Sequence, residues 1–479
     1  RRDTGSLPQR GRPYCRRDQS RLVCSQRRPP GSKARSRSVG GRSDGPRGRP
    51  SASRRPSVMD PESPQPAPRQ PRTGDLIRPV PRRGEGRPPR SKRKVPPPDP
   101  VRWPGYLGLF LLALIAFTPL FRSEIFWPTY EEVPRSAFPS LSGLTEAWSL
   151  QSIREADPFT LSSYFLERAL PLPPVWAHLS INLLLHLSAA VLLLRILEAL
   201  KLPRAFAAAA VFTLHPAVLP AMFWTGYREE LMGTVLILAA LLPGLRMRHA
   251  KDFLAMMLLA ALAVLAHPAA LALPPILALA VFFQRKPVHL ADFNHVLPLA
   301  AMALFLAVWL QSGSQTAELA SAGELLALGS QNLFFFFEQT FLPLNPAVFD
   351  PFAAGKVYRV GASSEILPFA FFLPFYTLCF FNLGKRWARG LLLGLSGYLL
   401  FALHGVFHVG TFIDGSPARE TAMLYTALPF IVALIVCGLA AALHHGGSGA
   451  RGLWRFTVGG FVALQLVLTA SMSYTLGQT

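Results

Sequence analysis

The chain is poor in cysteine and in acidic residues. Only four cysteines occur among 479 residues, and 27 Asp and Glu stand against 49 Lys and Arg. Cys15 and Cys24 lie in a polar tail, whereas Cys379 and Cys437 lie inside apolar runs, so neither a disulfide framework nor a zinc-binding spacing is present. Charge of either sign is also scarce after residue 100, which excludes an ordinary water-soluble domain.

The positive charge is concentrated in the first hundred residues, which hold 27 of the 49 Lys and Arg. Residues 1–103 consist mainly of Arg, Pro, Gly and Ser, a composition that buries too little apolar surface to offset the entropy of ordering. We expect this tail to be disordered. No methionine precedes Met59, and we expect Met59 to be the true start, with the Arg-rich residues before it being upstream sequence translated in frame.

The tail ends in a basic cluster that includes Arg90, Lys92, Arg93 and Lys94, just before the first apolar run. One interpretation is a signal that keeps the N-terminus in the cytoplasm. The other is attraction to anionic lipid headgroups, worth about 1 kcal/mol per residue near the surface. No aromatic residues are interleaved for base stacking, so we do not expect a nucleic-acid partner.

Long apolar runs after residue 103 predict an all-α, polytopic membrane protein. Crossing the hydrocarbon takes about 20 consecutive apolar residues. By that measure residues 104–479 form a transmembrane domain of eleven spans, at about 104–122, 174–198, 204–224, 230–245, 252–266, 268–284, 294–312, 366–383, 390–407, 421–442 and 454–473.

The positions of Lys and Arg between the spans predict the orientation. With the N-terminus in the cytoplasm, every basic loop falls on the cytoplasmic side and the C-terminus lies outside, as expected for an integral protein of a bacterial inner membrane. If the apolar stretch 325–344 also crossed the membrane, the basic loop that follows it would fall on the outer side. We therefore expect a helix there that lies in the interface or re-enters from outside. The large outer loops are then 123–173 and 313–365.

The outer loops hold candidate catalytic residues, because a lone charge in hydrocarbon is costly. Glu131 and Glu132 follow the first span, and Asp157 lies later in the same loop. A carboxylate near a lipid headgroup can act as a general base or hold a divalent cation that bridges a phosphate. The alternative is that these are solvated loop residues.

The second span carries a polar stripe, because His178, Asn182 and His186 recur every four residues and so share one helix face. This stripe forms either one wall of an active-site cleft or a set of interhelical hydrogen bonds. In the third span, Pro216 and Pro220 remove helical hydrogen bonds beside His215. We expect the helix to be distorted there and to open near a cavity.

Several arginines on the outer side are candidate phosphate ligands. Arg228 lies on the outer side, although Lys and Arg are usually found in cytoplasmic loops. It either binds a phosphate or pairs with Glu229 or Glu230. Arg359 lies in the second outer loop, and Arg419 and Glu420 precede the tenth span.

These residues occur in a recognisable pattern. DPFTLSSYFLERALPLPPVWAHLSINLLLHLSAAVLLLRIL at 157–197 and VFTLHPAVLPAMFWTGYREELMGTVLILAAL at 211–241 resemble the core of the GT-C superfamily of integral-membrane glycosyltransferases. The chain is most similar to members that join this core to tetratricopeptide repeats and are related to protein O-mannosyltransferases. The resemblance covers roughly 104–445, and its motifs match His178, Asn182, His186, His215, Pro216, Trp224, Arg228, Arg419 and Glu420.

The resemblance implies a GT-C-like bundle and an enzyme that moves a sugar from a polyprenyl-phosphate donor to a hydroxyl of a protein or glycan on the outer face. Glu131 or Glu132 would activate the acceptor, and the arginines would hold the lipid phosphate. The sequence departs from the family in its Glu pair where Asp is usual, in Pro220 at an expected acidic position, in His267-Pro268 where a Lys-Glu pair often precedes the sixth span, and in the lack of repeats. These departures support an alternative, a catalytically inactive membrane scaffold or assembly protein. A transporter is less favoured, because the spans show little sign of a proton relay.

Overall fold

The computed structural model describes residues 17–18, 21–22, 103–123, 141–149, 158–285, 287–311, 333, 335–341, 367–407, 421–444, 448–476 and 478. Contacts divide the chain into two units, Arg1–Val95 and Pro96–Thr479. In the first unit the described elements are two short antiparallel strands, β1 (Arg17–Asp18) and β2 (Arg21–Leu22), with Arg17 opposite Leu22. The rest of the tail lies outside the described residues, so its expected disorder stays a prediction.

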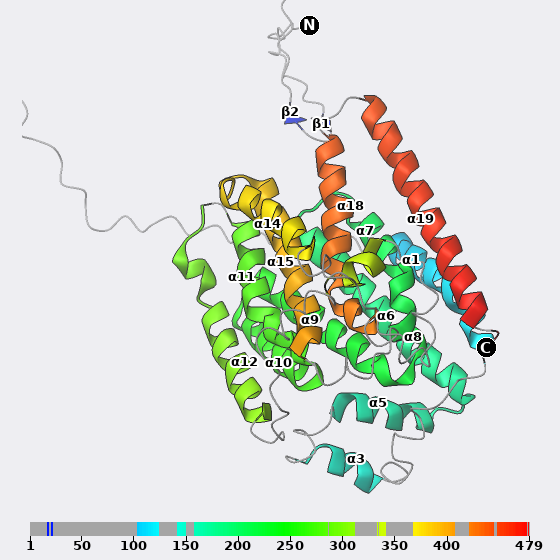
Figure 1. The fold of residues 1–479 in the computed structure, drawn as a ribbon. Helices are drawn as coiled ribbons and strands as arrows, with labels where there is room; N and C mark the ends of the chain where they lie inside the picture. The colour runs from blue at the N-terminus through cyan, green and yellow to red at the C-terminus, as the bar shows by residue number, and fades with distance from the viewer. Residues whose placement is uncertain are drawn as a thin grey trace, which may run out of the picture. The chain divides into compact units, whose positions relative to one another are not determined.

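In the second unit every regular element described is a helix (Figure 1), which confirms the predicted all-α class for this part of the chain. The third predicted span is formed by two helices, α7 and α8. The described helices of all the apolar segments are α1 (Trp103–Phe117), α6 (Pro174–Ala199), α7 (Ala205–Thr213), α8 (Leu219–Phe223), α9 (Arg228–Arg246), α10 (Ala250–Ala266), α11 (Leu273–Gln284), α12 (Val296–Gln311), α14 (Leu367–Phe380), α15 (Arg386–Phe407), α18 (Leu428–His444) and α19 (Ser448–Leu476).

Short elements join and extend these helices. The 3-10 helices are η1 (Thr118–Arg122), η2 (Pro216–Val218), η3 (Thr225–Tyr227), η4 (Pro268–Ala272), η5 (Leu290–Phe293) and η8 (Leu424–Thr426). Two further helices, α3 (Leu141–Ala147) and α5 (Pro158–Ala169), come from the predicted first outer loop. They lie across one end of the helix bundle in Figure 1.

Several helices are candidate membrane spans. Among the described residues, four helices are long and apolar enough to cross a bilayer, at Trp103–Arg122, Pro174–Ala199, Leu290–Leu310 and Phe456–Leu476. A fifth is added if α7 and the η2–α8 segment, bent by 56°, count as one. A membrane protein of several spans is therefore the fold that the helices support. By length and composition, fewer of the described helices qualify as spans than the eleven predicted, partly because several of the other apolar helices are shorter.

Both breaks at His-Pro sequences have the same local structure. The proline interrupts the helical hydrogen bonds, and the imidazole of the preceding histidine, as the N-cap of a 3-10 helix, accepts a hydrogen bond from an otherwise free backbone amide. His215 Nδ1 accepts from the amide of Ala217 at 3.2 Å, and His267 Nδ1 accepts from the amide of Ala269 at 3.2 Å. The predicted distortion beside Pro216 is confirmed, and a second one occurs at His267.

The first and last helices of the bundle lie side by side, since α19 packs along α1 and η1. At the centre of the bundle α6 packs against α9, α7 and α1. The buried side chains form one apolar cluster that extends through these helices and includes Leu109, Phe117, Phe212, Leu231 and Tyr425.

The stretch predicted at 325–344 is described in part, and residues 335–341 are helical. Phe336 is fully buried, and the carbonyl of Thr340 accepts a hydrogen bond from His215 Nε2 at 3.0 Å. One face of this helix packs against the break between α7 and α8, whereas Phe341 on it is 44% exposed. Both predicted arrangements, an interfacial helix and a re-entrant segment, stay predictions.

Direct hydrogen bonds gather three basic loops at one end of the bundle. Arg386 Nη2 donates to the carbonyl of Leu200, at the end of α6, at 2.9 Å. Arg389 Nη1 donates to the carbonyls of Phe282 at 3.0 Å and Arg285 at 2.9 Å, at the end of α11. Cations at helix C-termini satisfy carbonyls that have no partner within the helix. Three of the five basic loops that the charge pattern assigns to one side therefore meet at one end, and the orientation in the membrane stays a prediction.

Candidate functional site

A buried arginine occupies the end of the bundle opposite these basic loops. Arg228 is the first residue of α9, directly after the turn of η3, and its side chain has 0% of its surface exposed. A guanidinium is always charged in proteins, and it tolerates burial only when its N–H groups have partners. The surroundings of Arg228 therefore define the site.

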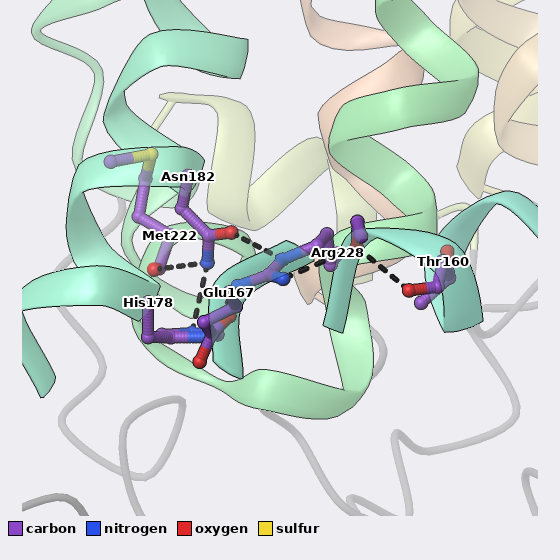
Figure 2. A network of polar contacts seen from close by, with 7 residues as sticks. Thr160, Glu167, His178, Asn182, Met222 and Arg228 are labelled. Carbon is purple, nitrogen blue, oxygen red and sulfur yellow. Dashed lines mark hydrogen bonds and ion pairs between the residues drawn. The ribbon is translucent and has the colours of Figure 1, made fainter. Parts of the chain in front are cut away.

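Four polar side chains surround the guanidinium (Figure 2). Its Nε donates to Asn182 Oδ1 at 2.8 Å, and Nη1 donates to Ser163 Oγ at 3.2 Å. Its Nη2 is ion-paired with Glu167 and lies 2.6 Å from His178 Nδ1. The guanidinium carbon also lies 4.5 Å from the centre of the Tyr164 ring, a cation–π distance.

The amide of Asn182 connects the arginine to the backbone before it. Its oxygen faces Arg228, and its nitrogen donates to the carbonyl of Met222 at 2.9 Å and lies 3.0 Å from His178 Nε2. Because Met222 belongs to α8, this one side chain holds α6, α8 and the start of α9 together. Asn182, His178 and Arg228 are all fully buried.

Glu167 carries the negative charge of the network from α5. Burial by itself raises the pKa of Glu167, but its hydrogen bond with His178 and the charge of Arg228 outweigh that effect and hold the pKa below its usual 4.5. Its Oε2 lies 3.4 Å from His178 Nδ1. The network thus attaches the loop helix α5 to α6 and α9.

Two polar atoms near this network are buried without a hydrogen-bond partner in the part of the chain that is described. They are Glu167 Oε1, an acceptor, and Trp224 Nε1, a donor. Such groups are rare in native proteins, and each one calls for an explanation. A bound water or a ligand hydroxyl would satisfy either of them.

A second buried pair lies further along α9. Glu230 Oε2 is 3.2 Å from His267 Nε2 and accepts a hydrogen bond from Thr426 Oγ1 at 3.1 Å. Gly233 makes this approach possible, because a Cβ there would lie 2.4 Å from the Cβ of His267. This pair joins α9 to α10 and η8.

The structure separates the residues of the predicted polar stripe. His178 and Asn182 contact Arg228, whereas His186 lies 2.8 Å from the hydroxyl of Tyr425 and 3.1 Å from the carbonyl of Thr213. His186 therefore makes interhelical hydrogen bonds, the second of the two interpretations. His215 likewise caps η2 and contacts Thr340 in the core, and it is 3% exposed.

Arg228 pairs neither with Glu229 nor with Glu230 among its described contacts. Its partner is Glu167, which the sequence pattern did not single out, and Glu230 contacts His267 instead. A signal for Glu167 was present, because Thr160, Ser163 and Glu167 are spaced three and four apart and so form a polar stripe on one face of α5. The phosphate-binding role of Arg228 stays a prediction.

The remaining predicted site residues lie outside the described residues. These are Glu131, Glu132, Asp157, Arg359, Arg419 and Glu420. Among the residues that are described, no three His, Cys, Asp or Glu side chains are grouped to hold a metal ion. The expected divalent cation therefore stays tied to Glu131 and Glu132. No family model matches the chain, and no curated protein matches it.

Removing the positive charge of the network is expected to destabilise the protein. Arg228→Gln leaves Glu167 buried without a counter-charge, which costs about 3–5 kcal/mol. Thermal unfolding of the detergent-solubilised protein measures this, and Glu167→Gln combined with Arg228→Gln should recover part of the loss. Arg195→Gln is the matched control, because Arg195 pairs with Glu198 at 3.8 Å with 42% and 30% of the side chains exposed. That change should cost at most about 1 kcal/mol, and equal losses from both arginines would contradict the buried network.

The lowered pKa of Glu167 predicts a loss of stability in acid. A carboxyl whose folded pKa lies below its unfolded value stabilises the fold fully above the unfolded pKa, and this contribution disappears as the pH falls through the folded pKa. The melting temperature of the wild type should therefore fall as the pH is lowered below about 4.5. Glu167→Gln should show a shallower fall in the same range. Parallel curves for the two proteins would show that Glu167 makes no such contribution.

Proposed function

We propose that this chain is an integral-membrane glycosyltransferase of the GT-C type, which transfers a sugar from a polyprenyl-phosphate donor to a hydroxyl of a protein or glycan acceptor. One observation carries the proposal. Three residues that match the family's motifs, His178 and Asn182 on α6 and Arg228 at the start of α9, converge in one buried network. That network lies under α5, the helix that follows the acidic loop.

The proposal includes eleven spans, a cytoplasmic N-terminus and an outer C-terminus. Its support is the separation of charge along the bundle. At one end, Arg386 and Arg389 donate hydrogen bonds to the backbone carbonyls of Leu200 and Arg285, so the loops near 200, 285 and 386 are held together. The network of Glu167 and Arg228 lies at the other end of α6 and α9, where an active site on the outer face requires it.

In the proposed reaction a carboxylate, Glu131 or Glu132, takes the proton of the acceptor hydroxyl. The hydroxyl oxygen bonds to the anomeric carbon of the sugar as the bond from that carbon to the phosphate oxygen breaks. The polyprenyl phosphate leaves with the bonding electrons, and Arg419 and Arg359 stabilise its charge. Arg228 is a positioning residue in this scheme, because its N–H groups already hold Asn182, Ser163 and Glu167.

The unpartnered atoms of Glu167 and Trp224 support a polar ligand beside this network. A sugar hydroxyl can donate to a carboxylate oxygen or accept from an indole N–H. Both atoms belong to segments next to Arg228.

A second candidate function is a non-catalytic membrane scaffold with the same fold. The full pairing of Arg228 within the protein favours it, because a guanidinium surrounded by protein groups does not need a phosphate. In this alternative the network only holds α5 in place. The two candidates differ in whether membranes that contain the protein transfer sugar.

The orientation predicts which engineered thiols are accessible in intact cells. Gly226→Cys and Glu146→Cys lie at the network end and should react with a membrane-impermeant maleimide. Gly384→Cys, in a basic loop, should not react until the membrane is opened. A Cβ meets nothing within 4 Å at Gly226 and Gly384, so both changes leave the packing intact. Labelling of Gly384→Cys in intact cells, or protection of Gly226→Cys, would overturn the orientation.

The catalytic assignment predicts a loss of sugar transfer on removal of the acidic pair. Membranes with Glu131→Gln and Glu132→Gln should transfer label from a polyprenyl-phosphate sugar about 10²–10⁴-fold more slowly, because general-base catalysis contributes that much. Glu146→Gln is the control, since Glu146 lies in the same loop and is exposed. Unchanged transfer by the double variant would remove the assignment. No transfer by the wild type from any polyprenyl-phosphate sugar would favour the scaffold.

A further inference from the structure

A cavity lies at the basic end of the bundle, away from the Arg228 network. It has a volume of about 540 Å³ and is bordered by the C-terminal part of α6 and by α9, α15 and α18. Its walls are apolar and include Leu197, Leu238, Leu393, Phe430 and Leu434. None of the described residues that line it is charged.

The cavity opens at the surface of the bundle and is not sealed in the core. Trp387, which lines it, is 48% exposed, and Gly438 and Ala441 on its α18 wall are also exposed. Protein interiors are packed to crystal density, with few voids larger than a water molecule. An apolar cavity of this size does not hold ordered water, so hydrocarbon is its natural filling.

The backbone at Gly438 contributes to this space. A Cβ built on Gly438 meets nothing within 4 Å, whereas one on Gly394, on the facing helix, meets the Cβ of Leu434 at 2.7 Å. The helices thus touch at Gly394 and remain apart at Gly438. The opening is a feature of this particular helix pair.

Exposed cations surround the same end. Lys201 lies between two lining residues, Leu200 and Leu202, and is exposed. Lys385 is also exposed, and its Nζ lies 6.0 Å from the ring centre of Trp387. Arg386 donates to the carbonyl of Leu200. Basic pockets between membrane helices on the cytoplasmic side bind anionic lipid headgroups.

We infer that this cavity binds one acyl chain of an anionic phospholipid, with the headgroup phosphate at Lys201 and Lys385. The apolar walls fit the chain, and the two lysines fit the phosphate. The site is distinct from the proposed donor site, because it lies at the opposite ends of α6 and α9. It does not depend on the protein being an enzyme.

Photo-crosslinking of the purified full-length protein tests the site. The probe is phosphatidylglycerol with a photoreactive acyl chain, and the matched lipid is phosphatidylcholine with the same chain. Crosslinks from phosphatidylglycerol should map to peptides of α15 and α18. Lys201→Gln and Lys385→Gln should each lower its capture about fivefold and leave phosphatidylcholine capture unchanged, since each charge contributes about 1 kcal/mol. Equal capture of the two lipids by the wild type, or preferential capture of a photoreactive polyprenyl phosphate, would overturn the proposal.

Filling the cavity provides an independent test. Gly438→Leu places a side chain in the open space and should remove most of the crosslinking, whereas Gly459→Leu, where a Cβ also meets nothing, should not.

Cys437 lines the cavity and Cys379 does not. Adding phosphatidylglycerol to delipidated wild type should slow alkylation of Cys437 relative to Cys379, a measurement that needs no variant to fold. Undiminished crosslinking in Gly438→Leu, or unchanged alkylation of Cys437, would contradict acyl-chain binding.

Discussion

The burial of one guanidinium constrains the architecture at one end of the molecule. Arg228 is removed from water entirely, and its charge is balanced by Glu167 from α5, while Asn182 and His178 from α6 complete its surroundings. A buried charge without partners is too costly to persist, so the helices that supply these groups must keep their positions. The Pro-interrupted segment α7–α8 is held in the same way, because Asn182 also binds the carbonyl of Met222. A helix that is outside the candidate spans is thereby attached to helices inside the bundle.

The opposite end of the bundle is held by a different kind of contact. Carbonyls at the ends of α6 and α11 accept hydrogen bonds from Arg386 and Arg389, so basic residues that orient a membrane protein also complete its helix termini. Elsewhere the described interior is mainly apolar, but it also buries polar pairs such as His186 with Tyr425 and Thr340 with Tyr398. Such pairs are expected inside a membrane bundle, because a buried polar group there finds its partner within the protein.

Much of this arrangement could be predicted from the sequence because its signals are local. Long apolar runs marked the helices to within a few residues, prolines marked the break between α7 and α8, and four-residue spacing placed His178, Asn182 and His186 on one face. The partner of Arg228 could not be found in this way, because Glu167 is distant in sequence and is brought near only by the tertiary fold. The same limit applies to His267, whose contact with Glu230 depends on the space left by Gly233. The four-residue spacing also did not reveal that His186 and His178 contact different residues.

The ionic network around Arg228 restricts the position of α5 more than apolar packing would. Replacing a buried ion pair with well-fitted apolar side chains is often neutral or stabilising, so the pair is not needed for stability alone. Its directional bonds fix one position of α5 against α6 and α9, whereas apolar surfaces tolerate sliding. Asp157 immediately precedes the first residue of α5, and Glu131 and Glu132 belong to the loop that leads to it. Anchoring Glu167 fixes α5, a helix about 18 Å long, against α6 and α9. In the enzyme we propose, the charges of Glu167 and Arg228 thereby give the acidic loop a fixed point of attachment on the bundle.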